Sequence, residues 1–84
     1  MTLLDFYADW CQPCKMMEPI IEKFKEENPN IIVEKVNTEE QIDLAVSYNI
    51  NVLPTFVLLD DNNEEVKRHL GVLNPVKLKE FVYA

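Results

Sequence analysis

The stretch Leu3–Met16 reads LLDFYADWCQPCKM, and it places two cysteines directly after a short apolar run. The run Leu3–Ala8 has the length of one strand, and its almost continuous apolar character is typical of a strand buried on both faces. Over Gln12–Asn28 apolar residues recur at the spacing of one helical face. A buried strand therefore passes directly into a helix, with Cys11 at the junction. The apolar positions of this helix are Met16, Met17, Ile20, Ile21 and Phe24.

The rest of the chain continues the alternation of strands and helices. Thr38 and Gln41 have the spacing of a capping box, which predicts the start of a second helix. Asn74 followed by Pro75 predicts the start of a third helix, because Asn is a good N-cap and Pro fits the first turn. Three more strands are expected: Ile31–Val36, and the pair Thr55–Asp60 and Glu65–Leu70 around the polar turn 61–64. The buried face of the second helix would carry Ile42, Ala45 and Val46, and that of the third Leu78, Phe81 and Val82.

This order of elements predicts an α/β fold. A strand–helix–strand unit makes a parallel pair with a right-handed crossover, and the hairpin adds antiparallel strands. The expected architecture is a four-stranded mixed sheet in the order βαβ-α-ββ-α, flanked by three helices on its two faces. The length of 84 residues suits a single domain, 1–84.

Composition excludes several classes of function. Fifteen acidic residues against eight basic ones give a net charge of −7, so the surface repels nucleic acid and anionic lipid. No apolar run approaches the roughly 18 residues that a transmembrane helix needs. The segment MTLLDF carries no positive charge, so we expect no secretory signal and a cytoplasmic location.

The two cysteines point to redox chemistry. Cys11 and Cys14 lie three residues apart, share one helix face, and can close a disulfide. Cys11 at a helix N-terminus should have its pKa lowered, because unpaired N–H groups stabilise a thiolate there. Two alternatives remain open. One is a zinc site, for which the chain offers only His69 and carboxylates as further ligands, and the other is an inert buried pair. A redox dithiol fits best, because C-x-x-C near a βαβ pattern is typical of it.

The motifs together resemble the thioredoxin family. The matching residues are the run Asp5–Lys15 (DFYADWCQPCK), Pro19, Lys35, the run Leu53–Thr55 (LPT) and Gly71. The resemblance covers the whole chain, with two departures. The chain begins at the Asp5 strand, where the family usually has a further strand and helix before it, and Gln12 replaces the usual glycine after the first cysteine.

The resemblance implies roles for the cysteines and the residues behind them. Cys11 would be the nucleophile and Cys14 the resolving cysteine. Asp5 would lie beneath Cys14 and accept its proton, which agrees with the raised pKa expected of a carboxylate within a buried strand. Lys35 would be the neighbour of Asp5.

The resemblance also implies a docking surface and a tuning segment. Trp10, Leu53, Pro54 and Gly71 would contact the substrate. Pro54 would be cis, so that backbone groups at Leu53 can pair with an extended substrate segment. The residues Gln12–Pro13 between the cysteines would tune the redox potential.

The expected function is that of a thiol–disulfide oxidoreductase that reduces protein disulfides. No cofactor or metal is expected. The expected partners are disulfide-containing proteins and a thioredoxin reductase or the glutathione system for regeneration, with the chain acting as a monomer. Two other functions stay open. One is a glutaredoxin-like electron carrier regenerated by glutathione, and the other is a redox-silent binding module.

Overall fold

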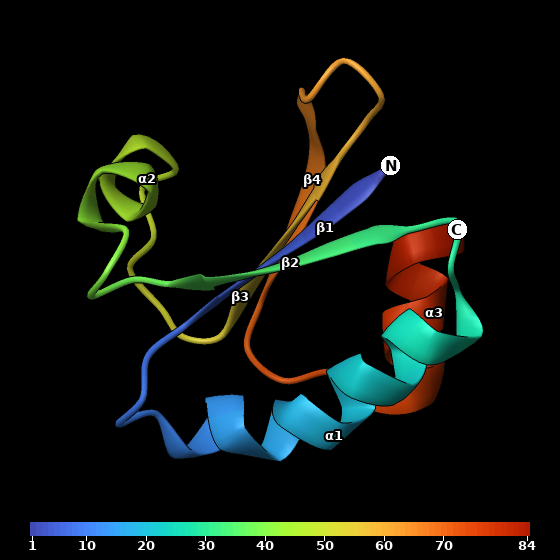
Figure 1. Ribbon diagram of the computed structural model, residues 1–84, viewed down its shortest axis with the longest axis horizontal. Helices are drawn as coiled ribbons and strands as arrows, with labels where there is room; N and C mark the ends of the chain where they lie inside the picture. Colours follow the sequence, from blue (N-terminus) through green and yellow to red (C-terminus); the bar gives the residue numbers. More distant parts are fainter.

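A computed structural model describes residues 1–84 and contains one mixed sheet with helices on both sides (Figure 1). The sheet has four strands in the order β2-β1-β3-β4. β1 pairs with β2 in parallel, while β1–β3 and β3–β4 are antiparallel. This confirms the predicted α/β architecture. The elements are β1 Thr2–Tyr7, α1 Gln12–Glu27, β2 Ile32–Asn37, α2 Ile42–Ser47, β3 Thr55–Leu59, β4 Glu65–Leu70 and α3 Pro75–Tyr83.

The central strand β1 is buried on both faces, because its successive side chains enter different cores. Leu3 packs into a cluster that includes residues of α1 and α3, whereas Leu4 and Phe6 pack into a cluster next to α2. Figure 1 shows α1 and α3 on one side of the strands and α2 on the other. The almost continuous apolar run of β1 is therefore explained by its place between two helical layers.

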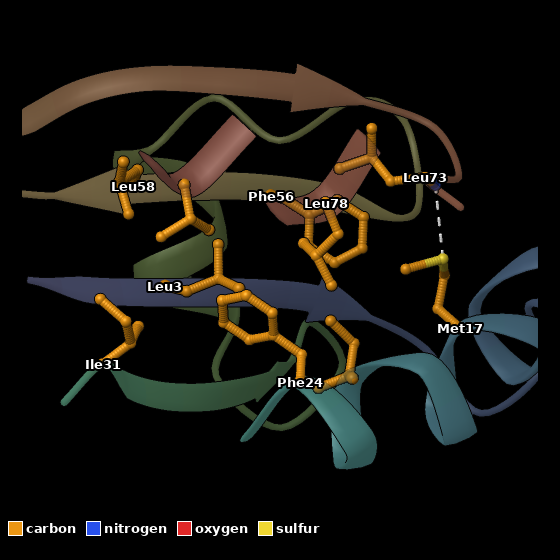
Figure 2. Close-up of a cluster of buried hydrophobic side chains, with 10 residues drawn as sticks. Leu3, Met17, Phe24, Ile31, Phe56, Leu58, Leu73 and Leu78 are labelled. Carbon is orange, nitrogen blue, oxygen red and sulfur yellow. Dashed lines mark hydrogen bonds between the residues drawn. The ribbon is translucent and has the colours of Figure 1, made fainter. Parts of the chain in front are cut away.

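The larger core lies between the sheet, α1 and α3. Figure 2 shows side chains from β1, β3 and both helices gathering in this layer, including Leu3, Phe24, Phe56 and Leu78. The backbone N–H of Leu73 points to the Met17 sulfur at 3.4 Å, drawn as a dashed line. Burying each large apolar side chain of this core, such as Leu3 or Phe56, stabilises the fold by about 1.5–3 kcal/mol. The core thus fixes α1, and with it the segment that carries the cysteines, against the sheet.

The capping box predicted at Thr38 is wrong. The Thr38 hydroxyl instead donates to the carbonyl of Tyr7 at 3.1 Å. α2 begins only at Ile42, and its N-cap Gln41 makes no side-chain capping bond. The local S/T-x-x-Q spacing gave the wrong start because a tertiary contact with the end of β1 occupies the hydroxyl.

Some expected core positions are also exposed. Ile42 and Val46 are 60% and 68% exposed, so of the expected face of α2 only Ala45 is buried. Met16 is 68% exposed, because the buried stripe of α1 passes through Met17. The six-residue α2 buries Ala45 alone, and the buried stripe of α1 runs on the side of Met17, so the neighbouring apolar positions of both helices face solvent.

The predicted start of α3 is confirmed. The Asn74 side chain accepts the backbone N–H of Lys77 at 2.8 Å, and Pro75 is the first residue of the helix. Leu78 and Val82 are buried, while Phe81 is half-buried and packs against the core from its edge. No helix has both the length and the apolar character to cross a membrane.

Candidate active site

The two cysteines form a disulfide at the start of α1. Their Cα atoms are 5.2 Å apart, within the usual range for this bond. Cys11 is the N-cap residue in an extended conformation, and its sulfur accepts the backbone N–H of Cys14 at 3.2 Å. Cys14 lies in the first turn. The fold therefore places Cys11 where unpaired N–H groups of a helix face a sulfur.

Exposure does not distinguish the two sulfurs in the oxidised protein. Cys11 is 4% exposed and Cys14 is 5% exposed. Both pack with Ala8 in a small buried cluster. Their difference is one of position, since Cys11 precedes the helix and Cys14 belongs to it.

Asp5 is a buried carboxylate on the face of the sheet that α1 covers. It shares that face with Leu3, because strand side chains alternate. It is 4% exposed, and its Oδ1 atom has no hydrogen-bond partner. Burial raises the pKa of Asp5 to about 6, with Lys35 lowering this pKa and Glu18 raising it. A carboxyl group with this pKa can gain and lose a proton near neutral pH.

Lys35 is the neighbour of Asp5 in the register of β1 and β2, but it does not form an ion pair with it. The two residues are Cα partners across the parallel pair. The Lys35 side chain is exposed, and its ammonium group lies 5.2 Å from the centre of the Tyr7 ring. Lys35 thus acts on Asp5 through its charge alone, while its head group rests on an aromatic face.

The loop before β3 lies against the disulfide. The Leu53–Pro54 peptide bond is cis, and Pro54 is buried. Leu53 packs against the cluster formed by Ala8 and the two cysteines. The Pro54 carbonyl accepts the backbone N–H of Gly71 at 2.8 Å, which joins this loop to the end of β4.

Gly71 has a backbone φ of +99°, a region that favours glycine. An ideal Cβ at this position would meet no atom within 4 Å. Gly71 is therefore required by its conformation rather than by lack of space.

The remaining predicted site residues lie on the surface at the start of α1. Trp10 precedes the first cysteine and is 67% exposed. Gln12 and Pro13 between the cysteines are also exposed. An aromatic side chain of this size left in solvent beside a disulfide is suited to contact a partner.

Sequence reasoning missed Glu18. This residue follows Cys14 by four positions and thus lies one helical turn further along the same side of α1, where its charge raises the pKa of Asp5. The spacing from Cys14 was visible in the sequence, but its relation to Asp5 depends on how α1 lies over β1. No group of three or more His, Cys, Asp or Glu side chains is arranged to hold a metal ion.

A thioredoxin family model matches residues 1–84. The chain belongs to the thioredoxin family. It is 39% identical to a thioredoxin of Chlamydia pneumoniae over 82 residues, covering 98% of this chain and 76% of the relative. With its Cys11–Cys14 disulfide, this thioredoxin family member is a thiol–disulfide oxidoreductase.

Solved structures agree with this assignment. The thioredoxin of Fasciola hepatica superposes with a TM-score of 0.90 at 34% identity, covering 96% of this chain and 76% of that one. A second chain has a TM-score of 0.87 at 32% identity, with 96% and 74% covered. It comes from a study of the structural basis of the thiol resolving mechanism in yeast mitochondrial 1-Cys peroxiredoxin via glutathione/thioredoxin systems.

Proposed function

We propose that this thioredoxin family member works as a reductant of protein disulfides, with unequal roles for its two cysteines. The Cys11 thiolate attacks one sulfur of the substrate disulfide, so that a mixed disulfide forms and the other substrate sulfur leaves as a thiolate. The Cys14 thiolate then attacks the Cys11 sulfur, which releases the second substrate thiolate. Two electrons pass to the substrate, and the Cys11–Cys14 disulfide remains.

The observation that carries this proposal is the disulfide at the start of α1 on the side of the sheet that holds a buried carboxylate. The Cys11 sulfur accepts the backbone N–H of Cys14, and the same N–H can stabilise a thiolate at Cys11 in the reduced protein. Cys14 lies inside α1 and not at its N-cap, so the unpaired N–H groups do not stabilise a thiolate there. Its thiol must therefore lose a proton to another group before Cys14 can resolve the mixed disulfide.

Asp5 is the proposed acceptor of the Cys14 proton. With a pKa of about 6 it is mostly ionised at neutral pH, yet basic enough to take up a proton from a thiol. Its Oδ1 atom, which lacks a partner in the oxidised protein, is free to receive that proton. Lys35 is proposed to modulate this step by its charge.

The exposed residues around the disulfide are the proposed contact surface for the substrate. Trp10 supplies a large exposed aromatic side chain, and Leu53 lies directly against the cysteine cluster. Pro54 and Gly71, joined by a hydrogen bond, hold the backbone of Leu53 in place. An extended substrate segment can pair with that backbone, which would bring its disulfide next to Cys11. Gln12 and Pro13 are proposed to tune the redox potential.

The wider setting of this function is also a proposal. We propose that the chain acts as a monomer in the cytoplasm, where a dithiol is kept reduced. Regeneration of the dithiol would come from a thioredoxin reductase or from glutathione. The related structure from the peroxiredoxin work concerns both the glutathione and the thioredoxin systems, so both donors are included in the test.

The test is reduction of insulin disulfides by the purified protein. The parent should accelerate precipitation of the insulin chains, whereas Cys11→Ser should be inactive. Cys14→Ser should accumulate a mixed disulfide between Cys11 and the substrate, because resolution is blocked. A mixed disulfide that forms in Cys11→Ser and not in Cys14→Ser would reverse the assigned roles.

A second measurement separates the two donors. NADPH oxidation is followed with thioredoxin reductase in one sample and with glutathione plus glutathione reductase in another. Turnover in the first alone supports the thioredoxin assignment, while turnover in the second alone supports the glutaredoxin-like alternative.

A further inference from the structure

A groove lies on the surface between α1 and α3, the two helices on the same side of the sheet in Figure 1. Its volume is about 380 Å³. The α1 residues that line it recur every three or four positions from Pro19 to Asn28, so the groove runs along this helix. That run corresponds to about 14 Å of helix. The groove can therefore accept an elongated ligand lying along the helices.

The floor of the groove is apolar. The buried side chains of Phe24 and Leu78 lie beneath it, and its accessible apolar surface comes from the half-buried Ile20 and the exposed Pro19 and Pro75. Val76 opens onto the groove and is 65% exposed. Covering such a surface with apolar side chains of a ligand is favourable, because it removes apolar area from water.

The two sides of the groove carry unpaired positive charge. Lys23 belongs to α1 and Lys79 to α3, and neither forms an ion pair within 4.0 Å. Glu27 is the one acidic residue in the lining. The groove is thus locally positive on a chain whose net charge is −7. A ligand with negative charge on both of its flanks would complement the two lysines.

This groove is separate from the redox site. No cysteine, and none of Asp5, Trp10, Leu53 or Pro54, belongs to its lining. Pro19, where the groove begins, follows Cys11 by eight residues, which corresponds to about 12 Å along a helix. A ligand in the groove need not cover the disulfide.

We propose that the α1–α3 groove binds an acidic amphipathic segment of a partner protein. The apolar side chains of the segment pack on Pro19, Ile20 and Val76, while its carboxylates face Lys23 and Lys79. The length of the groove matches about nine residues of a helix, and its apolar floor between charged edges fits an amphipathic helix. This binding site is independent of the proposed disulfide reduction.

The test is titration of the ¹⁵N-labelled protein with a synthetic acetylated and amidated peptide in which pairs of glutamates alternate with pairs of leucines. Amide shifts are expected at residues 20–28, along the end of α1 and its C-cap, and at residues 76–79 of α3. The double variant Lys23→Gln, Lys79→Gln should weaken binding by about fivefold at low salt, as two exposed ion pairs are lost. Val76→Asp, at an exposed position, should weaken it by more than about tenfold, because a carboxylate then stands in the floor.

Matched controls keep the result specific. Lys25→Gln removes one charge from α1 outside the groove and should leave the affinity unchanged. Insulin reduction should be the same in the parent and in the double lysine variant, so that a failure of the redox proposal is seen separately. The proposal is overturned by shifts centred on Trp10 and Leu53, by no binding at millimolar peptide, or by equal or tighter binding of a peptide with lysine in place of glutamate. It is also overturned if octanoate binds the groove more tightly than the peptide.

Discussion

Replacing Asp5 by asparagine should change how the stability of the oxidised protein depends on pH. Asp5 has a pKa of about 6 in the folded protein, against an ordinary value of 3.8. The folded state therefore holds a proton on Asp5 more tightly than the unfolded state does. Stability must fall as the pH rises between these two values, and this loss is complete above pH 6–7. Asparagine has no proton to lose, so the variant lacks this contribution.

The size of the effect follows from the two pKa values. Each pH unit between them corresponds to 1.36 kcal/mol, so ionised Asp5 destabilises the folded state by about 3 kcal/mol at pH 7.5. Part of this develops below pH 5, near the isoelectric point of about 4.5, where a net charge close to zero favours precipitation. Between pH 5 and pH 7.5 the stability of Asp5→Asn should rise relative to the parent by about 1.4 kcal/mol.

The assay is urea unfolding of the oxidised parent and of Asp5→Asn, followed by circular dichroism at pH 5, 6 and 7.5. The difference between the two proteins is compared across pH, because a constant cost of burying the asparagine amide then cancels. Asp43→Asn is the matched control, because it makes the same exchange at an exposed position. A difference between Asp5→Asn and the parent that stays constant within about 0.3 kcal/mol would refute the reasoning, because the buried carboxyl would then have no raised pKa.

Three further changes test the neighbours of the site and the packing of the helices. Glu18→Gln should lower the pKa of Asp5, because a nearby negative charge is removed; ¹³C NMR titration of the Asp5 carboxyl checks this, and an unchanged pKa would contradict it. Asn74→Ala should lower the free energy of unfolding by about 1 kcal/mol through loss of the α3 cap, with Asn74→Ser close to the parent in urea. Tyr83→Phe should cost about 1 kcal/mol, since its hydroxyl donates to the buried Asn28 side chain at 2.6 Å; equal unfolding midpoints would show that this bond adds nothing.

Local sequence was enough to predict the α/β fold and the position of the cysteines. The strand Leu3–Ala8 and the apolar face of Gln12–Asn28 were recognisable because a period of two or 3.6 residues needs no distant partner. The cap at Asn74 was predicted correctly for the same reason, since its acceptor and the donor at Lys77 are neighbours in the chain. The pair Cys11 and Cys14 depended only on its own spacing and on the helix that follows.

Tertiary structure decided the features that depend on residues far apart in the chain. Thr38 had the spacing of a cap, but its hydroxyl bonds to Tyr7 in the neighbouring strand. The position of Lys35, paired with Asp5 in register yet resting on the Tyr7 ring, requires the parallel pairing of β1 and β2.

The same holds for the one charge and the one surface groove that sequence reasoning did not find. Glu18 acts on Asp5 only because α1 lies across β1, and the groove of Lys23 and Lys79 exists only because α1 and α3 share one face of the sheet. The sequence by itself determined the redox pair and the elements that carry it, since those rest on local periodicity and spacing. The proton affinity of Asp5 and the shape of the surface were decided by folding, because burial and charge pairing arise only when distant segments pack together.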